Sequence, residues 1–509
     1  MKKLSRRDFL KLIASVSAGA AVSSFRPARS LLEEQKPNFV VLAADAMSAA
    51  HLSLYGYARR TTPNLERLAG RAIVYHSHYA GGNFTTAGTA SILTGSYPWT
   101  HRAVNLGSTV RAPLADRNIF NLLGPAYFRA GFTQNILADL FLRQFGKGVD
   151  LHIPLTSFIY KQDKPVVSHT LAKDPLMAYY AMDDFLISTH QAARLVPGSI
   201  SAGYLGMFYV LENKDIGRPT EDYPYGMPSN SFYFYENNAV YDAVRETIAN
   251  LHRESRPFFA YIHLMSPHSP YNPSREFVDT LADIPFPTRK VHPLGDHVKA
   301  AELLRMRKQY DEYIANIDSE MGRLLDGLQS AGILDDTYFF ILSDHGEMFE
   351  RGVQGHVTPL LYEPIVRTPL LVFAPGQTRR VDVHAATSNA DILPTVLSLA
   401  GRDVPAGEGR LLPGLGGVED ENRPVFSVEA KESSAFIPLS RASVSMVKGG
   451  RKIIHYKGYE KSSNAFELYD LRDDNEEKRD LYEKGAPDAA RMKEELLDSL
   501  AQAEKNLKK

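Results

Sequence analysis

Residues 343–363, SDHGEMFERGVQGHVTPLLYE, place a carboxylate and an imidazole side by side at Asp344 and His345. Oxygen and nitrogen donors on a tight turn suit a divalent metal ion, although such a pair alone is more often a surface turn. A second carboxylate, Asp45, ends another apolar run far away in the sequence. Because parallel strands can bring such residues together at one sheet edge, all three are candidate metal ligands.

A segment rich in small and hydroxyl-bearing residues, GGNFTTAGTASILTGSYPWTH at 81–101, lies between these positions. It can present a hydroxyl at the N-terminus of a helix, where backbone amides and the helix dipole favour an anionic ester group. Taken alone, the same pattern fits a threonine N-cap better.

Short apolar runs that end in polar residues predict the strands that would carry these groups. Buried strands are predicted at 37–45, 257–265, 337–344 and 368–375, because runs rich in Val, Leu and Phe are typical of parallel sheets. Apolar residues spaced by three and four predict helices at 238–253 and 309–328. The alternation predicts an α/β fold, with a doubly wound, mostly parallel sheet flanked by helices.

The chain is expected to contain one large and one small folded unit. Residues 36–405 form the predicted catalytic domain, within which the Tyr- and Phe-rich stretch 150–235 is either a substrate-facing insertion or, as we favour, ordinary packing. Residues 410–509 are expected to form a small C-terminal α+β subdomain, with a strand near 451–456 and a polar helix over 487–508.

The composition of the 509-residue chain is that of an ordinary globular protein, with 44% hydrophobic and 23% charged residues. A formal net charge of -1 gives no indication of nucleic acid as a partner. Because the sequence contains no cysteine, it can form neither disulfides nor thiolate metal sites, and it has no cysteine to oxidise to formylglycine.

Residues 1–30 are expected to be an export signal. The start MKKLSRRDFLK, with adjacent Arg6 and Arg7, resembles the bacterial twin-arginine signal, so the export machinery is an expected partner. Cleavage after Ser30 would fit a small-residue site. The apolar stretch 10–22 falls short of the roughly 20 residues that span a bilayer. The mature protein is therefore expected to be periplasmic or extracellular, and not an integral membrane protein.

Several motifs together resemble the sulfatase family of the alkaline-phosphatase superfamily. They are NFVVLAADAMSAAHLSLYGYARRTTPNLERLA, SILTGSYPWTH, YIHLMSPHSPYNP, YFFILSDHGE, ADILPTVLSLAG and FELYDLRDDNEEKRDLY. They follow the family's order over nearly the whole mature chain. The resemblance implies an alkaline-phosphatase-like fold and a metal-dependent enzyme acting on phosphate or sulfate esters.

The resemblance places the nucleophile ten residues before Gly95, at Thr85, with Thr86 as the second choice. Sulfatases carry Cys or Ser there, in a C/S-x-P/A-x-R pattern, whereas this chain reads TTAGT. Similar nucleotide pyrophosphatases and phosphoethanolamine transferases use an unmodified Thr on phosphorus. In addition, Ala46 replaces the second Asp of the sulfatase pair, and the expected Lys and His are missing around 136–142.

The implied ligand set is Asp45, Thr85, Asp344 and His345. Four mixed oxygen and nitrogen ligands favour one Zn²⁺ ion, with Mn²⁺, Mg²⁺ or Ca²⁺ as alternatives.

Five further polar residues have expected roles near this site. The resemblance gives His268 and His356 the task of holding ester oxygens or protonating the leaving group. His263 and His101 are expected to pack or to support the site from behind. Glu347 either supports the metal site or faces solvent.

The predicted function is hydrolysis, or transfer, of a phosphate ester through a phospho-threonine intermediate. One alternative is a sulfatase that works without formylglycine, and another is a metal- or ligand-binding member of the fold that has no turnover. The expected substrate is a small-molecule, lipid or glycan ester.

Overall fold

The computed structural model describes residues 36–506, apart from 156, 159–218, 231–233, 285, 287–288 and 463–464. The expected signal at 1–30 and most of the stretch at 150–235 therefore lie outside the described residues. No helix in the described part is both long and apolar enough to span a membrane.

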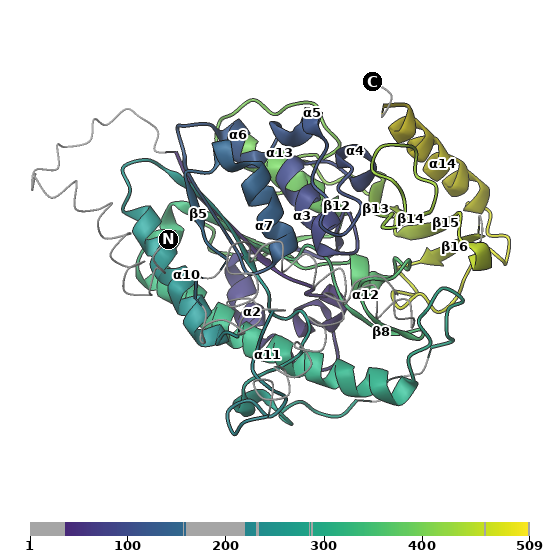
Figure 1. Ribbon diagram of the computed structural model, residues 1–509, viewed down its shortest axis with the longest axis horizontal. Coiled ribbons are helices and arrows are strands. Elements are labelled where there is room, and N and C mark those ends of the chain that lie inside the picture. Colours follow the sequence, from purple (N-terminus) through teal and green to yellow (C-terminus); the bar gives the residue numbers. More distant parts are fainter. Residues whose placement is uncertain are drawn as a thin grey trace, which may run out of the picture.

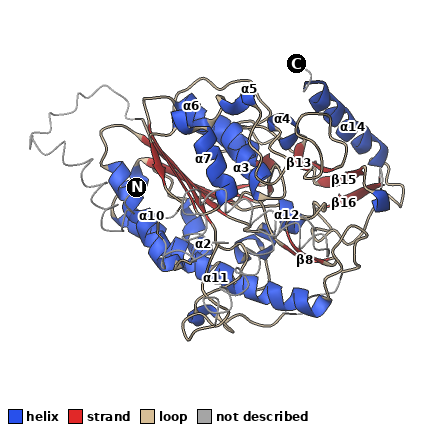
Figure 2. Cartoon of the chain, viewed as in Figure 1, coloured by secondary structure: helices blue, strands red, loops and turns tan. Residues whose placement is uncertain are grey.

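An eight-stranded mixed sheet, in the order β11-β2-β10-β7-β1-β6-β4-β5, forms the centre of the protein (Figures 1 and 2). Its strands are β1 (Asn38–Ala44), β2 (Ile73–Tyr75), β4 (Phe128–Thr133), β5 (Leu151–Ile153), β6 (Phe258–Leu264), β7 (Thr337–Leu342), β10 (Leu370–Phe373) and β11 (Val381–Val383). Neighbouring strands run parallel, except that β10 is antiparallel to both β2 and β7.

The four apolar runs predicted as strands are β1, β6, β7 and β10. Every residue of β1 is buried, because helices cover both faces of the sheet, and this is why the strand shows no alternation of apolar and polar residues. Strand β10 turns back against β7. The link between them holds only the hairpin β8 (Met348–Glu350) and β9 (Val353–Gly355) and the short helix α12 (Glu363–Val366), and no full crossover helix.

The helices form one layer on each face of the sheet (Figure 1). Residues of α2, α10 and α11 share a core with Val40 and Leu42 of β1, whereas residues of α3, α6, α7 and α13 share the opposite core with Phe39 and Val41. The bounds are α2 (Pro63–Leu68), α3 (Thr85–Thr94), α4 (Pro98–His101), α5 (Ala112–Ala115), α6 (Ile119–Leu123), α7 (Ile136–Gln144), α10 (Asn237–His252), α11 (Ala300–Ser330) and α13 (Ile392–Leu399). This confirms the predicted α/β fold.

Helix α11 begins nine residues before the predicted start at 309. Between residues 300 and 309 only Leu303 and Arg307 are buried, so the apolar spacing that marks the rest of the helix is absent there.

A four-stranded antiparallel sheet and one helix end the chain, as expected for a small α+β unit. They are β13 (Val425–Glu429), β14 (Ala442–Lys448), β15 (Arg451–Lys457), β16 (Ala465–Asp470) and α14 (Ala489–Asn506). Side chains of α14 and of this sheet pack in one core with Tyr97 and Trp99, which follow α3. A two-stranded sheet of β3 (His78–Tyr79) and β12 (Thr387–Ser388) lies beside it, in contact with β13.

Candidate active site and metal centre

The candidate ligands gather at the carboxyl ends of adjacent parallel strands. Asp45 directly follows β1, and Asp344 stands two residues after β7, the neighbour of β1 in the sheet. His345 comes next in the chain, and all three side chains are fully buried. Side chains at the carboxyl ends of neighbouring parallel strands meet there, as the sequence predicts.

Thr85 is the first residue of α3 and points its hydroxyl at this edge. The N-cap is Phe84, which makes no side-chain capping bond, so Thr85 does not act as an N-cap. Helix α3 comes close to the end of β7 at Gly88, where an added Cβ would lie 2.1 Å from the carbonyl oxygen of Asp344. The small residues of the segment therefore bring the hydroxyl to the carboxylates.

His345 connects the predicted ligands. Its Nε2 lies 3.4 Å from Thr85 Oγ1, 3.4 Å from Asp45 Oδ1 and 3.6 Å from Asp344 Oδ2. The structure thus brings the four predicted ligands to one place.

The unsatisfied polar atoms of the site fit a metal ion. Ligand atoms of Asp45, His263 and Asp344 lie within 4.8 Å of one another. Asp45 Oδ1, Asp344 Oδ2 and His263 Nε2 are buried and have no hydrogen-bond partner. Leaving such atoms unpaired is costly, and a divalent cation would satisfy all three. His263 was not among the expected ligands, and its only sequence signal is a histidine within an otherwise apolar strand.

Without a metal ion, the buried carboxylates and imidazoles of the site stabilise each other's charged forms. Burial raises the pKa of Asp45, but nearby His268, His345 and His263 outweigh it and hold that pKa below its usual value. Burial lowers the pKa of His345, yet Asp344 and Asp45 raise it to about 9. Burial also lowers the pKa of His263, but the same two carboxylates outweigh it and raise that pKa above its usual value. A cation that binds here must therefore displace protons from imidazoles.

Asn135, the N-cap of α7, touches both the nucleophile candidate and a ligand. Its Oδ1 accepts a bond from the backbone N–H of Leu137 at 2.8 Å, which fixes the direction of the amide. Its Nδ2 then donates to Asp45 Oδ2 at 2.6 Å and to Thr85 Oγ1 at 3.2 Å. The cation expected around 136–142 is absent from the sequence, and this neutral donor one residue earlier was not among the predicted site residues.

Two of the predicted histidines stand beside His345. The ring centroids of His345 and His356 are 4.1 Å apart, and those of His356 and His268 are 5.0 Å apart. Buried Glu347 Oε1 lies 3.1 Å from His356 Nδ1, so Glu347 orients this ring and does not face solvent. Burial and neighbouring His345 lower the pKa of His356 to about 4, so its imidazole is neutral near pH 7.

The two remaining predicted residues turn away from the ligands. Thr86 Oγ1 accepts a bond from the backbone N–H of Gly107 at 3.4 Å. His101 is fully buried, with Nε2 at 3.2 Å from Ser91 Oγ on α3, and so it packs behind the helix.

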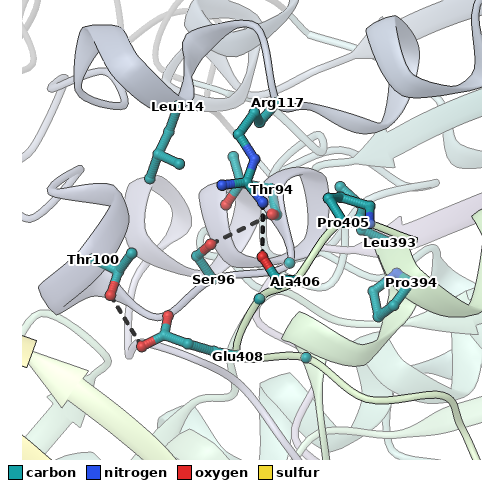
Figure 3. Close-up of a pocket in the computed structure, with 13 residues that line it drawn as sticks. Thr94, Ser96, Thr100, Leu114, Arg117, Leu393, Pro394, Pro405, Ala406 and Glu408 are labelled. Atoms are coloured by element: carbon teal, nitrogen blue, oxygen red, sulfur yellow. Dashed lines mark hydrogen bonds between the residues drawn. The ribbon is translucent and has the colours of Figure 1, made fainter. Parts of the chain in front are cut away.

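A separate surface pocket, shown in Figure 3, lies at the opposite end of α3. Thr94 and Glu408 help to line it, and the ten residues of α3 put Thr85 roughly 14 Å from Thr94. The Glu408 carboxylate accepts bonds from Trp99 Nε1 and Thr100 Oγ1, so it is already satisfied by the protein. This pocket is therefore separate from the candidate metal ligands.

Known proteins share this fold and sequence pattern. N-acetylgalactosamine-6-sulfatase of Mus musculus is 25% identical over 400 residues, which are 75% of this chain and 65% of that protein, less than two thirds of its length. The multifunctional alkaline phosphatase superfamily protein PehA of Trinickia caryophylli is 27% identical over 406 residues, 70% of this chain and 71% of that protein. The crystal structure of the phosphonate monoester hydrolase of Agrobacterium radiobacter has a TM-score of 0.63 at 20% identity, covering 92% of this chain and 96% of the other.

Two family descriptions match the sequence. The one named N-sulphoglucosamine sulphohydrolase, C-terminal, matches residues 357–506, and the one named Sulfatase matches residues 37–402. The second match spans all eight strands of the central sheet and every candidate ligand. This chain belongs to the sulfatase family.

Proposed function

We propose that this protein is a metal-dependent ester hydrolase of the sulfatase family that cleaves phosphate esters, with Thr85 as its nucleophile. The observation that carries the proposal is the Thr85 hydroxyl. It stands at a helix N-terminus, 3.4 Å from His345 Nε2 and 3.2 Å from Asn135 Nδ2, in a chain without cysteine. An unmodified threonine suits attack on phosphorus and cannot form the aldehyde hydrate of formylglycine.

Asp45, Asp344, His345 and Thr85 would hold one divalent metal ion, and we favour Zn²⁺ because its ligand set includes imidazole nitrogen. Bound there, the ion would lower the pKa of the Thr85 hydroxyl and polarise an ester oxygen.

In the first step the Thr85 hydroxyl gives up its proton to solvent, Oγ1 attacks phosphorus, and the bond from phosphorus to the leaving oxygen breaks, giving phospho-threonine. Asn135 Nδ2 donates to Thr85 Oγ1 and favours the anionic form of that oxygen. His268 Nδ1 lies 2.7 Å from the carbonyl oxygen of Ser269, so it donates there. When the ring carries a second proton, on Nε2, it can give that proton to the departing oxygen.

In the second step water attacks the phosphoryl group, and Thr85 Oγ leaves and regains a proton. His356 donates from Nδ1 to Glu347, which leaves the unprotonated Nε2 of a neutral ring to take the proton from water. An acceptor alcohol in place of water would make the same chemistry a transfer.

The second candidate function is sulfate ester hydrolysis without formylglycine. It is favoured by the name of the mouse relative, a sulfatase. Ala46 and the neutral Asn135 argue against it, because Ala46 offers no carboxylate to the metal and Asn135 is not a cation that could hold a sulfate.

Export by the twin-arginine pathway is also part of the proposal. It is supported by the sequence of residues 1–30, SRRDFLK included. A location in the periplasm or outside the cell would bring envelope lipids, glycans and environmental esters within reach of the enzyme.

The proposal is tested by measuring turnover of three substrates that share the same aryl group: a phosphate monoester, a phosphate diester and a sulfate ester. We expect phosphoester turnover in the wild-type protein and a loss of roughly 10³-fold or more in Thr85→Ala. Thr86→Ala is the matched control, because this neighbouring hydroxyl bonds Gly107 and should leave turnover within a few-fold of wild type. Dominant sulfate turnover, or an active Thr85→Ala protein, would contradict the proposal.

A further inference from the structure

His263 is a buried imidazole whose two ring nitrogens have different surroundings. It lies in β6, the strand between β1 and β4 in the sheet, and its side chain is fully buried. A histidine in the core normally has hydrogen-bond partners at its ring nitrogens. Here Nδ1 has such a partner, but Nε2 has none.

The partner of Nδ1 determines which nitrogen carries the proton. Thr133 Oγ1 donates its only proton to the carbonyl oxygen of Asn135 at 3.0 Å and accepts from the backbone N–H of Asn135 at 3.0 Å. One lone pair remains on Thr133 Oγ1, and His263 Nδ1 lies 3.2 Å from this oxygen. His263 must therefore donate from Nδ1, and in the neutral ring this leaves a lone pair on Nε2.

The free lone pair points at the metal site. His263 Nε2 lies 3.4 Å from Asp344 Oδ2 and 3.8 Å from Asp45 Oδ2. Donors placed tetrahedrally at about 2.0–2.2 Å from zinc lie roughly 3.3–3.6 Å from one another. The 3.4 Å distance from His263 Nε2 to Asp344 falls in this range, whereas the 3.8 Å distance to Asp45 Oδ2 is slightly longer. The distances from His345 Nε2 to Asp45 and Asp344, 3.4 Å and 3.6 Å, fall in the range as well.

We propose that His263 is a ligand of the resident metal ion, beside Asp45, Asp344 and His345, and that Thr133 holds its ring in the ligating tautomer. The inference rests on the metal site of the proposed function and adds a second imidazole to it, so that Asp45, Asp344, His345 and His263 form the tetrahedral set and the Thr85 hydroxyl is a fifth ligand. Two nitrogen donors select zinc, or cobalt as its substitute, over Mg²⁺ and Ca²⁺, which prefer oxygen ligands.

The competing role of His263 is that of a buried counter-ion to the carboxylates, and zinc-dependent stability separates the two. A counter-ion stabilises the metal-free protein, so its loss lowers the unfolding temperature with and without zinc. A ligand adds to the rise in unfolding temperature that zinc causes, because only the folded state offers the site.

The experiment compares wild type, His263→Gln, Thr133→Val and His455→Gln, measuring zinc affinity by competition with a chelator and the zinc-induced rise in unfolding temperature. We expect affinity to fall about 100-fold or more in His263→Gln and about 10-fold in Thr133→Val, which keeps the ring. His455, a buried histidine stacked on Phe466 in the C-terminal sheet, is the matched control and should leave both readouts unchanged. Unchanged zinc affinity in His263→Gln would overturn the proposal.

X-ray absorption of the zinc-loaded wild-type protein decides the question if His263→Gln does not fold. Two imidazole ligands support the proposal, and one overturns it. Suppose that the wild-type protein binds zinc and shows Thr85-dependent turnover, but that His263→Gln binds zinc equally well. In that case only the inference about His263 fails. A wild-type protein that binds no zinc contradicts both the inference and the metal site of the proposed function.

Discussion

The α-carbon of Gly88 packs directly against the carbonyl group of Asp344, so that a Cβ at position 88 would lie 2.1 Å from that oxygen. This contact joins the helix that carries the nucleophile candidate to the strand end that carries a proposed metal ligand. The distance between Thr85 and the carboxylates therefore depends on the absence of one methyl group.

Gly88→Ala is expected to destabilise the protein, although alanine ordinarily favours a helix interior by about 1 kcal/mol over glycine. The clash is with backbone, which cannot rotate away, so we expect a loss of about 1–3 kcal/mol in the free energy of unfolding. Gly146→Ala is the control, since a Cβ there meets nothing within 4 Å. Urea unfolding measures both, and equal stability of the two variants would contradict the packing described.

Asn135→Asp tests the amide that holds Thr85. Aspartate retains the N-cap of α7, because the two residues cap helices equally well, but it replaces the donor to Thr85 with an acceptor. We expect phosphoester kcat to fall about 10²-fold. The unfolding temperature should fall as well, because a carboxylate at 135 would face buried Asp45 Oδ2, to which Asn135 Nδ2 now donates at 2.6 Å. Asn118→Asp makes the same change at the N-cap of α6 and should keep full activity. An active Asn135→Asp enzyme would exclude the amide from catalysis.

His356→Gln and Glu347→Gln should slow the second step more than the first. In the proposed mechanism His356 is the neutral base for water, and Glu347 Oε1 lies 3.1 Å from its Nδ1. In stopped-flow assays with an aryl phosphate we expect a burst of phenol close to one per protein, followed by turnover about 10²-fold slower in His356→Gln. Loss of the burst itself would assign His356 to the first step and not to the second.

Folding stability is expected to fall in mild acid because of His78. This residue is buried between Thr387 and Asn389, and burial lowers its pKa from the ordinary 6.5 to about 4. Below pH 6.5 the unfolded chain binds a proton that the folded chain binds only near pH 4, so stability is lost as the pH falls through this window.

At about pH 5 the loss should be about 2 kcal/mol relative to neutral pH. In His78→Gln this contribution is absent, so the difference in unfolding free energy between the two pH values should be smaller by that amount. Urea titrations at both pH values measure it, and an equal difference in wild type and variant would contradict the assignment.

The sequence was most informative where a potential ligand side chain follows directly on an apolar strand. Asp45 and Asp344 could be placed together because each ends an apolar run, and such runs align in a parallel sheet. His263 could not be found in this way, since a histidine inside a strand becomes a ligand only through its distance to residues on two other strands. Asn135 was missed because a neutral amide has no charge to mark it. Its role depends on the bond from Leu137 that aims it.

The proposed phospho-threonine is the most direct test of the central claim. Wild-type protein mixed with an aryl phosphate monoester, quenched in acid within the first turnover and digested, gives the peptide covering residues 81–101 for mass spectrometry. We predict one phosphoryl group on Thr85, more of it in His356→Gln and none in Thr85→Ala. An unmodified Thr85 during steady turnover, or a phosphoryl group on Thr86 or another residue, would contradict the account.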